Sequence, residues 1–124
     1  MNKEQKMVLD FHKKYGCLYR EKPFVPDDST LLLRTRLLQE EVAEFTKGAS
    51  LRDLAMMADA LCDIIYVAYG AAVCMGIDLE PIYAEVQRSN MTKDGGGVDG
   101  GGKIMKGKDF QEPDIIGEIK KQEV

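Results

Sequence analysis

The sequence has little of what several common function classes require. Its three cysteines, Cys17, Cys62 and Cys74, are odd in number and form no CxxC pair. This pattern excludes a disulfide framework and a zinc site, and it is typical of free thiols in a reducing cytoplasm. The single histidine, His12, has no candidate nucleophile beside it, so we expect no catalytic role for it.

An excess of positive charge is also missing. The chain has 17 Lys and Arg against 21 Asp and Glu, a net charge of −4. A nucleic-acid-binding module or a protein of anionic membranes would need a basic patch. The N-terminal residues MNKEQK lack the apolar core of a secretory signal, and the apolar stretch 64–77 is shorter than a membrane span of ~20 residues. We therefore expect a cytoplasmic protein with no nucleic-acid or membrane partner.

What is present is a small set of helical patterns. With 124 residues and 44% hydrophobic content, the chain predicts one domain, 1–124. Apolar residues recur at helical spacing, and no convincing strand pattern appears. We expect an all-α, four-helix antiparallel bundle whose core is completed by oligomerisation. The predicted helices run over 3–14, 28–47, 50–75 and 78–89, with stops at Gly16, Gly48 and Gly76.

A glycine-rich segment follows the fourth predicted helix. Residues 94–109 contain seven of the twelve glycines, so we predict a flexible loop, followed by a short C-terminal tail. The segment lacks a GK[ST] ending and a preceding strand, which excludes a P-loop. A flap over a substrate and a plain linker both remain open. Its lysines, Lys103, Lys106 and Lys108, are either solvated or reach phosphate.

Two aspartates interrupt the most apolar helix. Asp59 and Asp63 are the only charged residues between Ala55 and Met75. Their i,i+4 spacing places both on one helical face. A buried carboxylate must be paired, hydrogen-bonded or bound to a metal. A salt bridge to an arginine is the structural alternative, and the candidates are Arg34, Arg36 and Arg52.

A second acidic cluster lies on the preceding helix, at the edge of its apolar stripe. Glu40, Glu41 and Glu44 recur there at helical spacing. A solvated helix face is the simpler interpretation of these three taken alone. Together with the aspartates they would repel one another unless a cation lay between them. Carboxylate oxygens are the ligands that Mg²⁺ and Mn²⁺ prefer, so we predict a divalent-cation site.

These residues resemble a known family. EEVAEF, then ADALCDIIYVAYGAAVCMGID and EVQRSNMTK, are similar to motifs of the MazG-like all-α nucleoside triphosphate pyrophosphohydrolases. That superfamily includes dimeric dUTPases and phosphoribosyl-ATP pyrophosphohydrolases. The resemblance covers about Leu31 to Ile115 and is closest to the short, single-domain members.

The resemblance implies a metal site. The first family motif, Glu-x-x-Glu, corresponds to Glu41 and Glu44, with Glu40 as an additional acid. The second motif, Glu-x-x-Asp, has its Asp at Asp63 but Ala60 at the Glu position. We expect Asp59 to supply the missing carboxylate, which leaves the ligand set and the number of ions open. The implied metal ligands for two or more Mg²⁺ or Mn²⁺ ions are Glu41, Glu44, Asp59 and Asp63.

The resemblance also implies a reaction. Glu40 or Glu41 would accept a proton from water, and Arg88, Asn90 and Lys93 would bind substrate phosphates. Family members convert a (d)NTP to the monophosphate and pyrophosphate. We expect a deoxynucleotide here, with dGTP and dUTP slightly ahead, and a homodimer or homotetramer. The alternatives are phosphoribosyl-ATP as substrate, and a non-catalytic nucleotide- or metal-binding helical module.

Overall fold

The computed structural model describes all 124 residues, and all of its regular secondary structure is helical. The all-α prediction is confirmed, since extended pairing is limited to one isolated bridge between Val98 and Ile104. The chain divides into two compact units, 1–78 and 79–124, which are described separately below. The helices are α1 (Lys3–Tyr15), α2 (Asp28–Ser50), α3 (Leu54–Met75), α4 (Leu79–Asn90) and α5 (Ile115–Gln122).

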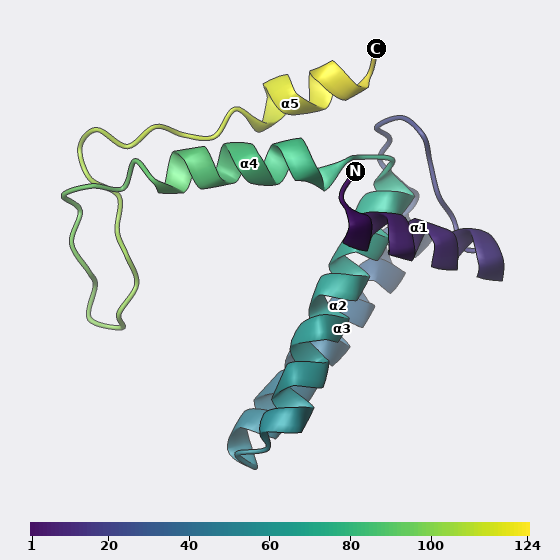
Figure 1. The fold of residues 1–124 in the computed structure, drawn as a ribbon, viewed down its shortest axis with the longest axis horizontal. Helices are drawn as coiled ribbons and strands as arrows, with labels where there is room; N and C mark the ends of the chain where they lie inside the picture. The colour runs from purple at the N-terminus through teal and green to yellow at the C-terminus, as the bar shows by residue number, and fades with distance from the viewer. The chain divides into compact units, whose positions relative to one another are not determined.

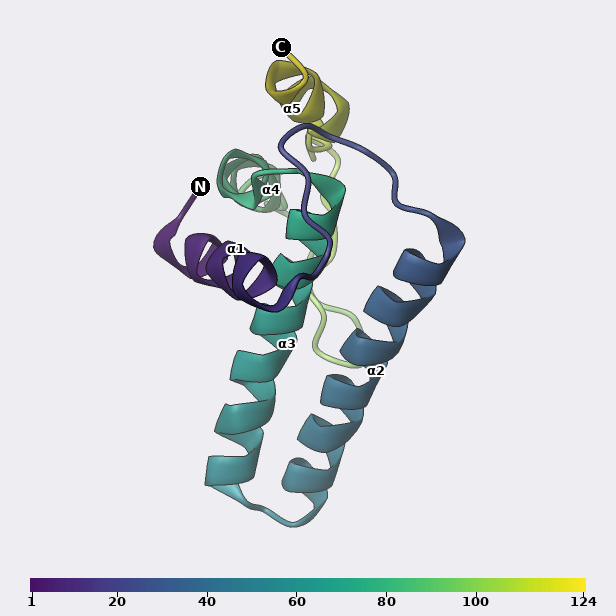
Figure 2. The same cartoon turned by 90° about the vertical axis from the view of Figure 1, so that its right-hand side faces the viewer.

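The first unit is built around α3. Helices α2 and α3 run side by side in opposite directions, joined by a short turn, and α1 packs against α3 (Figures 1 and 2). Because α3 contacts both other helices, it is the central helix of this unit. The antiparallel α2–α3 hairpin carries both acidic clusters predicted above.

Side-chain caps explain where the helices of this unit begin. Asn2, Asp27 and Asp53 each accept a hydrogen bond from a backbone N–H in the first turn of the following helix. Asp27 caps α2, which begins at Asp28 as the predicted range 28–47 had it. Asp53 caps α3, so the predicted start at residue 50 was wrong, and Ser50 is the last residue of α2.

Glycines end two of these helices but not the third. Gly16 and Gly76 terminate α1 and α3 in the left-handed conformation, as predicted. Gly48 was predicted to end α2, yet it lies inside that helix and is buried. A Cβ at Gly48 would come within 3.1 Å of the Met56 and Met57 side chains, so its role is close helix packing.

The buried core lies around the C-terminal half of α3. Ala72, Val73 and Cys74 are buried there together with Val8 of α1. The segment between α1 and α2 also crosses this end, because Arg20 N–H donates to the Val73 carbonyl at 3.1 Å and Phe24 N–H to the Met75 carbonyl at 2.9 Å. The N-terminal half of α3 has only α2 as a neighbour in this unit.

The N-terminal half of α3 is consequently more exposed than the sequence predicted. Leu61 and Ile65 are 49% and 53% exposed, although the most apolar helix of a chain is expected to be buried in the core. By length and composition α3 could cross a membrane, with only 28% of its apolar window buried, but core helices of soluble proteins meet the same criteria. Two aspartates inside the helix make a membrane span costly.

The second unit contains α4, the glycine-rich segment and α5, and α4 packs against α5 (Figure 1). The glycine-rich segment folds back on itself, with Asp99 N–H donating to the Lys103 carbonyl at 2.9 Å and Met105 N–H to the Gly97 carbonyl at 3.0 Å. The residues on either side of this fold form the isolated bridge between Val98 and Ile104. Since α4 belongs to this unit, the four-helix bundle stays a prediction.

Candidate functional site

The register of the α2–α3 hairpin brings the two acidic clusters opposite each other. Gly48 of α2 approaches Met56 of α3, and Arg34 of α2 approaches Gly70 of α3. Glu41 lies midway between Arg34 and Gly48, and Asp63 lies midway between Met56 and Gly70. Two helices of equal rise in antiparallel register must therefore place Glu41 across from Asp63.

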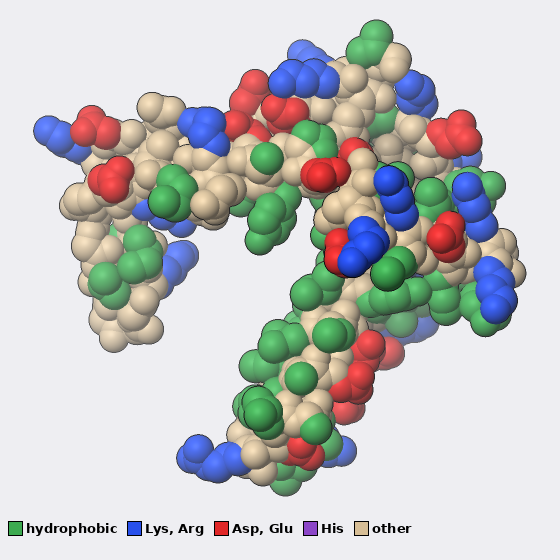
Figure 3. All heavy atoms as spheres, in the orientation of Figure 1, with side chains coloured by type: hydrophobic (Ala, Val, Ile, Leu, Met, Phe, Trp, Pro, Cys, Tyr) green, Lys and Arg blue, Asp and Glu red, His purple; other side chains and the backbone are tan.

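The electrostatics of Glu41 show that the clusters share one environment. Partial burial raises the pKa of its carboxyl group, and neighbouring negative charges raise it further. In decreasing order of effect, these charges belong to Asp63, Glu44, Asp59 and Glu40. The structure thus brings all five predicted acidic residues within electrostatic reach of one another. In the space-filling view, acidic side chains gather along one flank of the α2–α3 hairpin (Figure 3).

The salt-bridge alternative for these acids is not what the structure shows. Arg36 pairs with Glu40 at 3.9 Å across one turn of α2, and both side chains are mostly exposed. An exposed pair of this kind contributes little. Neither Asp59 nor Asp63 forms an ion pair, and Arg34 lies beside Gly70 instead. Apart from this exposed contact of Arg36, no cation of the chain pairs with the acidic residues around Glu41.

The aspartates are less buried than predicted. Asp59 is exposed and Asp63 is partly exposed, because their half of α3 is covered only by α2 within the first unit. No three acidic, histidine or cysteine side chains converge closely enough to form a closed set of metal ligands. The donor chemistry, all carboxylate oxygens open to solvent, fits a hard divalent ion that keeps waters in its shell. The metal site therefore stays a prediction.

The predicted phosphate-binding residues lie in the second unit. Arg88 donates to both carboxylate oxygens of Glu85, at 2.7 and 2.9 Å, and also to the Gln111 side chain and the Glu112 carbonyl. This network lowers the pKa of Glu85 to about 2, chiefly through Arg88 and then through the Asp114 N–H. Arg88 thus ties α4 to the segment before α5, and most of its donors are already used.

Asn90 and Lys93 lie at the end of α4. Asn90 is the last residue of α4 and is exposed, whereas Lys93 lines a pocket formed with the glycine-rich segment. That these residues and the carboxylates of the first unit act as one site stays a prediction.

A second polar cluster on the hairpin had not been predicted from the sequence. The Arg34 guanidinium lies in the space left by the missing side chain of Gly70, and its Nε is buried without a hydrogen-bond partner. His12 lies beside it, buried, with Nδ1 2.8 Å from the Leu18 carbonyl. Burial lowers the pKa of His12, the Leu18 carbonyl raises it, and the Arg34 charge lowers it. A glycine in the middle of an apolar helix was the one sequence signal for this contact.

Comparison with known proteins identifies the family. Residues 8–90, more than half of the chain, match the family model of phosphoribosyl-ATP pyrophosphohydrolase. The chain belongs to this family. The match confirms the resemblance to the MazG-like all-α pyrophosphohydrolase superfamily. It extends from α1 through α4, includes both acidic clusters, and ends before the glycine-rich segment.

One curated relative extends the comparison to a viral protein. An uncharacterized protein of Acanthamoeba polyphaga mimivirus is 32% identical over 77 residues, which is 59% of this chain and 31% of that protein. The chain therefore spans about a third of the length of the relative it matches.

Proposed function

We propose that this family member is a metal-dependent pyrophosphohydrolase that converts a deoxynucleoside triphosphate to its monophosphate and pyrophosphate. The observation that carries the proposal is the setting of Glu41. Four other carboxylates raise the pKa of its carboxyl group, and the chain supplies only the exposed contact of Arg36 with Glu40 against their charge. Carboxylates that repel one another in the free protein are expected at a site where a bound cation compensates their charge.

The chemistry assigned to each residue follows from its position. Glu41, Glu44, Asp59 and Asp63 would hold Mg²⁺ or Mn²⁺, which neutralises polyphosphate charge and lowers the pKa of water. Glu40 or Glu41 would accept the proton from water, and Glu40 stays available for this role when Glu41 holds the ion, because its contact with Arg36 is exposed and 3.9 Å long. Asn90 and Lys93 would bind the phosphates, with Lys93 as a point cation.

Two substrates compete under this proposal. A deoxynucleotide, with dGTP and dUTP slightly ahead, is our first candidate. Phosphoribosyl-ATP is the second, and the description of the matching family favours it. Both reactions release pyrophosphate, so the same carboxylates serve either one. We further propose a cytoplasmic homodimer or homotetramer with no nucleic-acid or membrane partner.

Pyrophosphate release tests the proposal directly. The substrates are the common ribo- and deoxyribonucleoside triphosphates, dUTP and phosphoribosyl-ATP, each with Mg²⁺, Mn²⁺ or EDTA. We expect metal-dependent release from one or a few of them. Release from phosphoribosyl-ATP alone would select the second candidate. No release from any of them would leave a non-catalytic binding module.

Variants connect the activity to the acidic clusters. Glu41→Gln and Asp63→Asn should each lower turnover by at least about 100-fold while circular dichroism stays helical. Glu4→Gln, an exposed acid on α1, is the matched control. Mg²⁺ should also raise the thermal unfolding temperature of the wild type but not of Glu41→Gln. Full activity in either acidic-cluster variant would contradict the assignment.

A further inference from the structure

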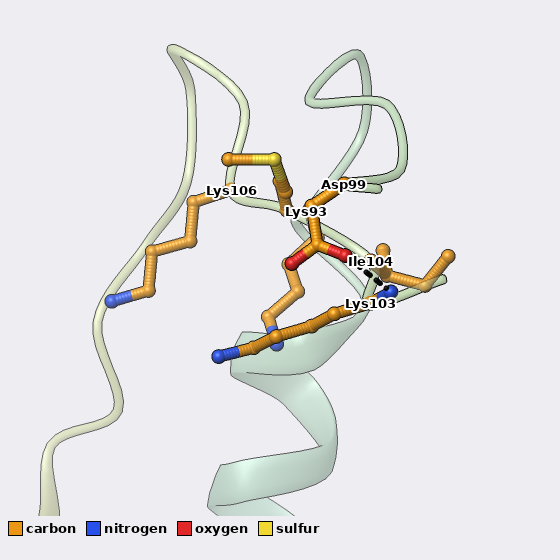
Figure 4. Close-up of a pocket in the computed structure, with 6 residues that line it drawn as sticks. Lys93, Asp99, Lys103, Ile104 and Lys106 are labelled. Carbon is orange, nitrogen blue, oxygen red and sulfur yellow. Dashed lines mark hydrogen bonds between the residues drawn. The ribbon is translucent and has the colours of Figure 1, made fainter. Parts of the chain in front are cut away.

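A pocket of about 320 Å³ lies in the second unit, where the end of α4 meets the folded glycine-rich segment. Its lining is rich in positive charge. Three of the six side chains are lysines and only one is acidic: Lys93, Asp99, Lys103, Ile104, Met105 and Lys106 (Figure 4).

Of the three lysines that line this pocket, only Lys106 forms an ion pair. Oδ1 of Asp99 accepts from the backbone N–H groups of Gly101 and Lys103, at 2.8 and 3.0 Å, so this carboxylate shapes the turn. Lys106 forms an ion pair with Glu112 at 3.3 Å and lies over the Phe110 ring. No carboxylate forms an ion pair with Lys93 or Lys103. Both side chains line the same pocket (Figure 4).

Hydrogen bonds order the backbone at both lysines. Lys103 donates its N–H to Asp99 and accepts the Asp99 N–H on its carbonyl at 2.9 Å, so the turn fixes it on both sides. Lys93 follows the last turn of α4, where Thr92 donates to the Ser89 carbonyl at 2.6 Å and accepts the Gln111 N–H at 2.9 Å. Two lysines that line one pocket repel each other, and an anion bound between them removes that repulsion.

We propose that Lys103, together with Lys93, binds the polyphosphate of the substrate and the pyrophosphate product. The proposal rests on the proposed function, and it decides for Lys103 between the two interpretations that the sequence left open, solvation and phosphate contact. Lys103 supplies the second cation, because most donors of Arg88 are engaged with Glu85, Gln111 and Glu112. A polyphosphate is the chemical class that fits, since it offers adjacent negative oxygens to two neighbouring point cations.

Calorimetric binding of inorganic tripolyphosphate and pyrophosphate to the full chain, in EDTA, measures this site without turnover. We expect Lys103→Gln to weaken tripolyphosphate binding by about tenfold or more, as loss of a charge-assisted contact does. Lys108→Gln is the matched control, an exposed lysine of the same segment outside the pocket. It should change binding less than about twofold.

Steady-state kinetics supply a second readout. Lys103→Gln should raise KM for the triphosphate and the inhibition constant of pyrophosphate in parallel, because both contain the phosphates that the lysine binds. Equal effects of Lys103→Gln and Lys108→Gln would overturn the proposal, since general electrostatics would then explain them. Lysine-dependent preference for a single-stranded oligonucleotide over tripolyphosphate would also overturn it.

The failure of this proposal is distinguishable from the failure of the proposed function. If the wild type binds tripolyphosphate through Lys103 but hydrolyses no nucleotide, the anion site stands and the function fails. If the wild type hydrolyses nucleotides and Lys103→Gln behaves like Lys108→Gln, the function stands and the anion site fails.

Discussion

At the scale of single residues, Glu41 carries most of the functional interpretation. Its helical spacing from Glu40 and Glu44 was readable from the sequence, and so was the i,i+4 pair Asp59 and Asp63. Their combined effect on the pKa of Glu41 depends on the register of α2 against α3, which only the structure shows. The competing arginine pairings could not be excluded from the sequence, because a long flexible side chain reaches many neighbours.

His12 offers a clean test of the Arg34 contact, because it is the only histidine and gives a single imidazole signal. Arg34→Met should raise the pKa of His12, since the nearby positive charge is removed. That pKa should still stay below its ordinary value of 6.5, because burial remains. An NMR pH titration measures the shift. Arg36→Met, which removes an exposed arginine paired with Glu40, is the control and should leave the pKa unchanged.

The same contact predicts a pH dependence of stability. Folded His12 has a lowered pKa, so the unfolded chain binds more protons near and below pH 6.5. Stability contributed by this group is therefore lost as the pH falls through that value, and the loss should be smaller in Arg34→Met. An unchanged His12 pKa in Arg34→Met would contradict the contact.

At the scale of elements, these glycines end a helix only where no neighbouring helix packs against them. Gly16 and Gly76 end their helices as the sequence predicted, but Gly48 does not. The side chains of Met56 and Met57 fill the space beside Gly48, and this contact cannot be read from local sequence. Likewise, Ser50 and Asp53 both satisfy the rules for an N-cap, and only the course of the turn selects Asp53.

Gly16 and Gly76 form a matched pair for measuring one packing contact. Their φ angles are 67° and 66°, so alanine costs about 1–2 kcal/mol of backbone strain at either position. A Cβ at Gly76 would also overlap the Lys22 carbonyl oxygen, whereas nothing lies within 4 Å at Gly16. Chemical denaturation should show Gly76→Ala to be less stable than Gly16→Ala by about 1 kcal/mol or more. Equal losses would mean that the segment crossing the end of α3 does not pack there.

At the scale of the whole molecule, the apolar surface of the α2–α3 hairpin predicts self-association. Leu32 and Val42 of α2 are 67% and 52% exposed, and Leu61 and Ile65 of α3 are 49% and 53% exposed. Apolar surface of this kind marks a contact with another chain more often than a free face. It agrees with the homodimer or homotetramer proposed above.

Light scattering after size-exclusion chromatography tests this prediction. We expect the wild type to elute as a dimer or tetramer, and Ile65→Glu to shift toward monomer because it places a charge on the exposed face of α3. Val25→Glu, at a 76% exposed position between α1 and α2, is the control and should not change the mass. A monomeric wild type, or one that floats with lipid vesicles, would contradict self-association through this face.

The sequence by itself determined the helical class, most helix spans and the identity of the acidic residues, because helical periodicity and capping are local properties of the chain. Only the tertiary structure decided which groups meet. Packing set the register that opposes Glu41 to Asp63 and placed Arg34 against Gly70. It also gathered Lys93 and Lys103 into one pocket. These contacts join residues far apart in the chain, and their geometry depends on how side chains fill the space between elements.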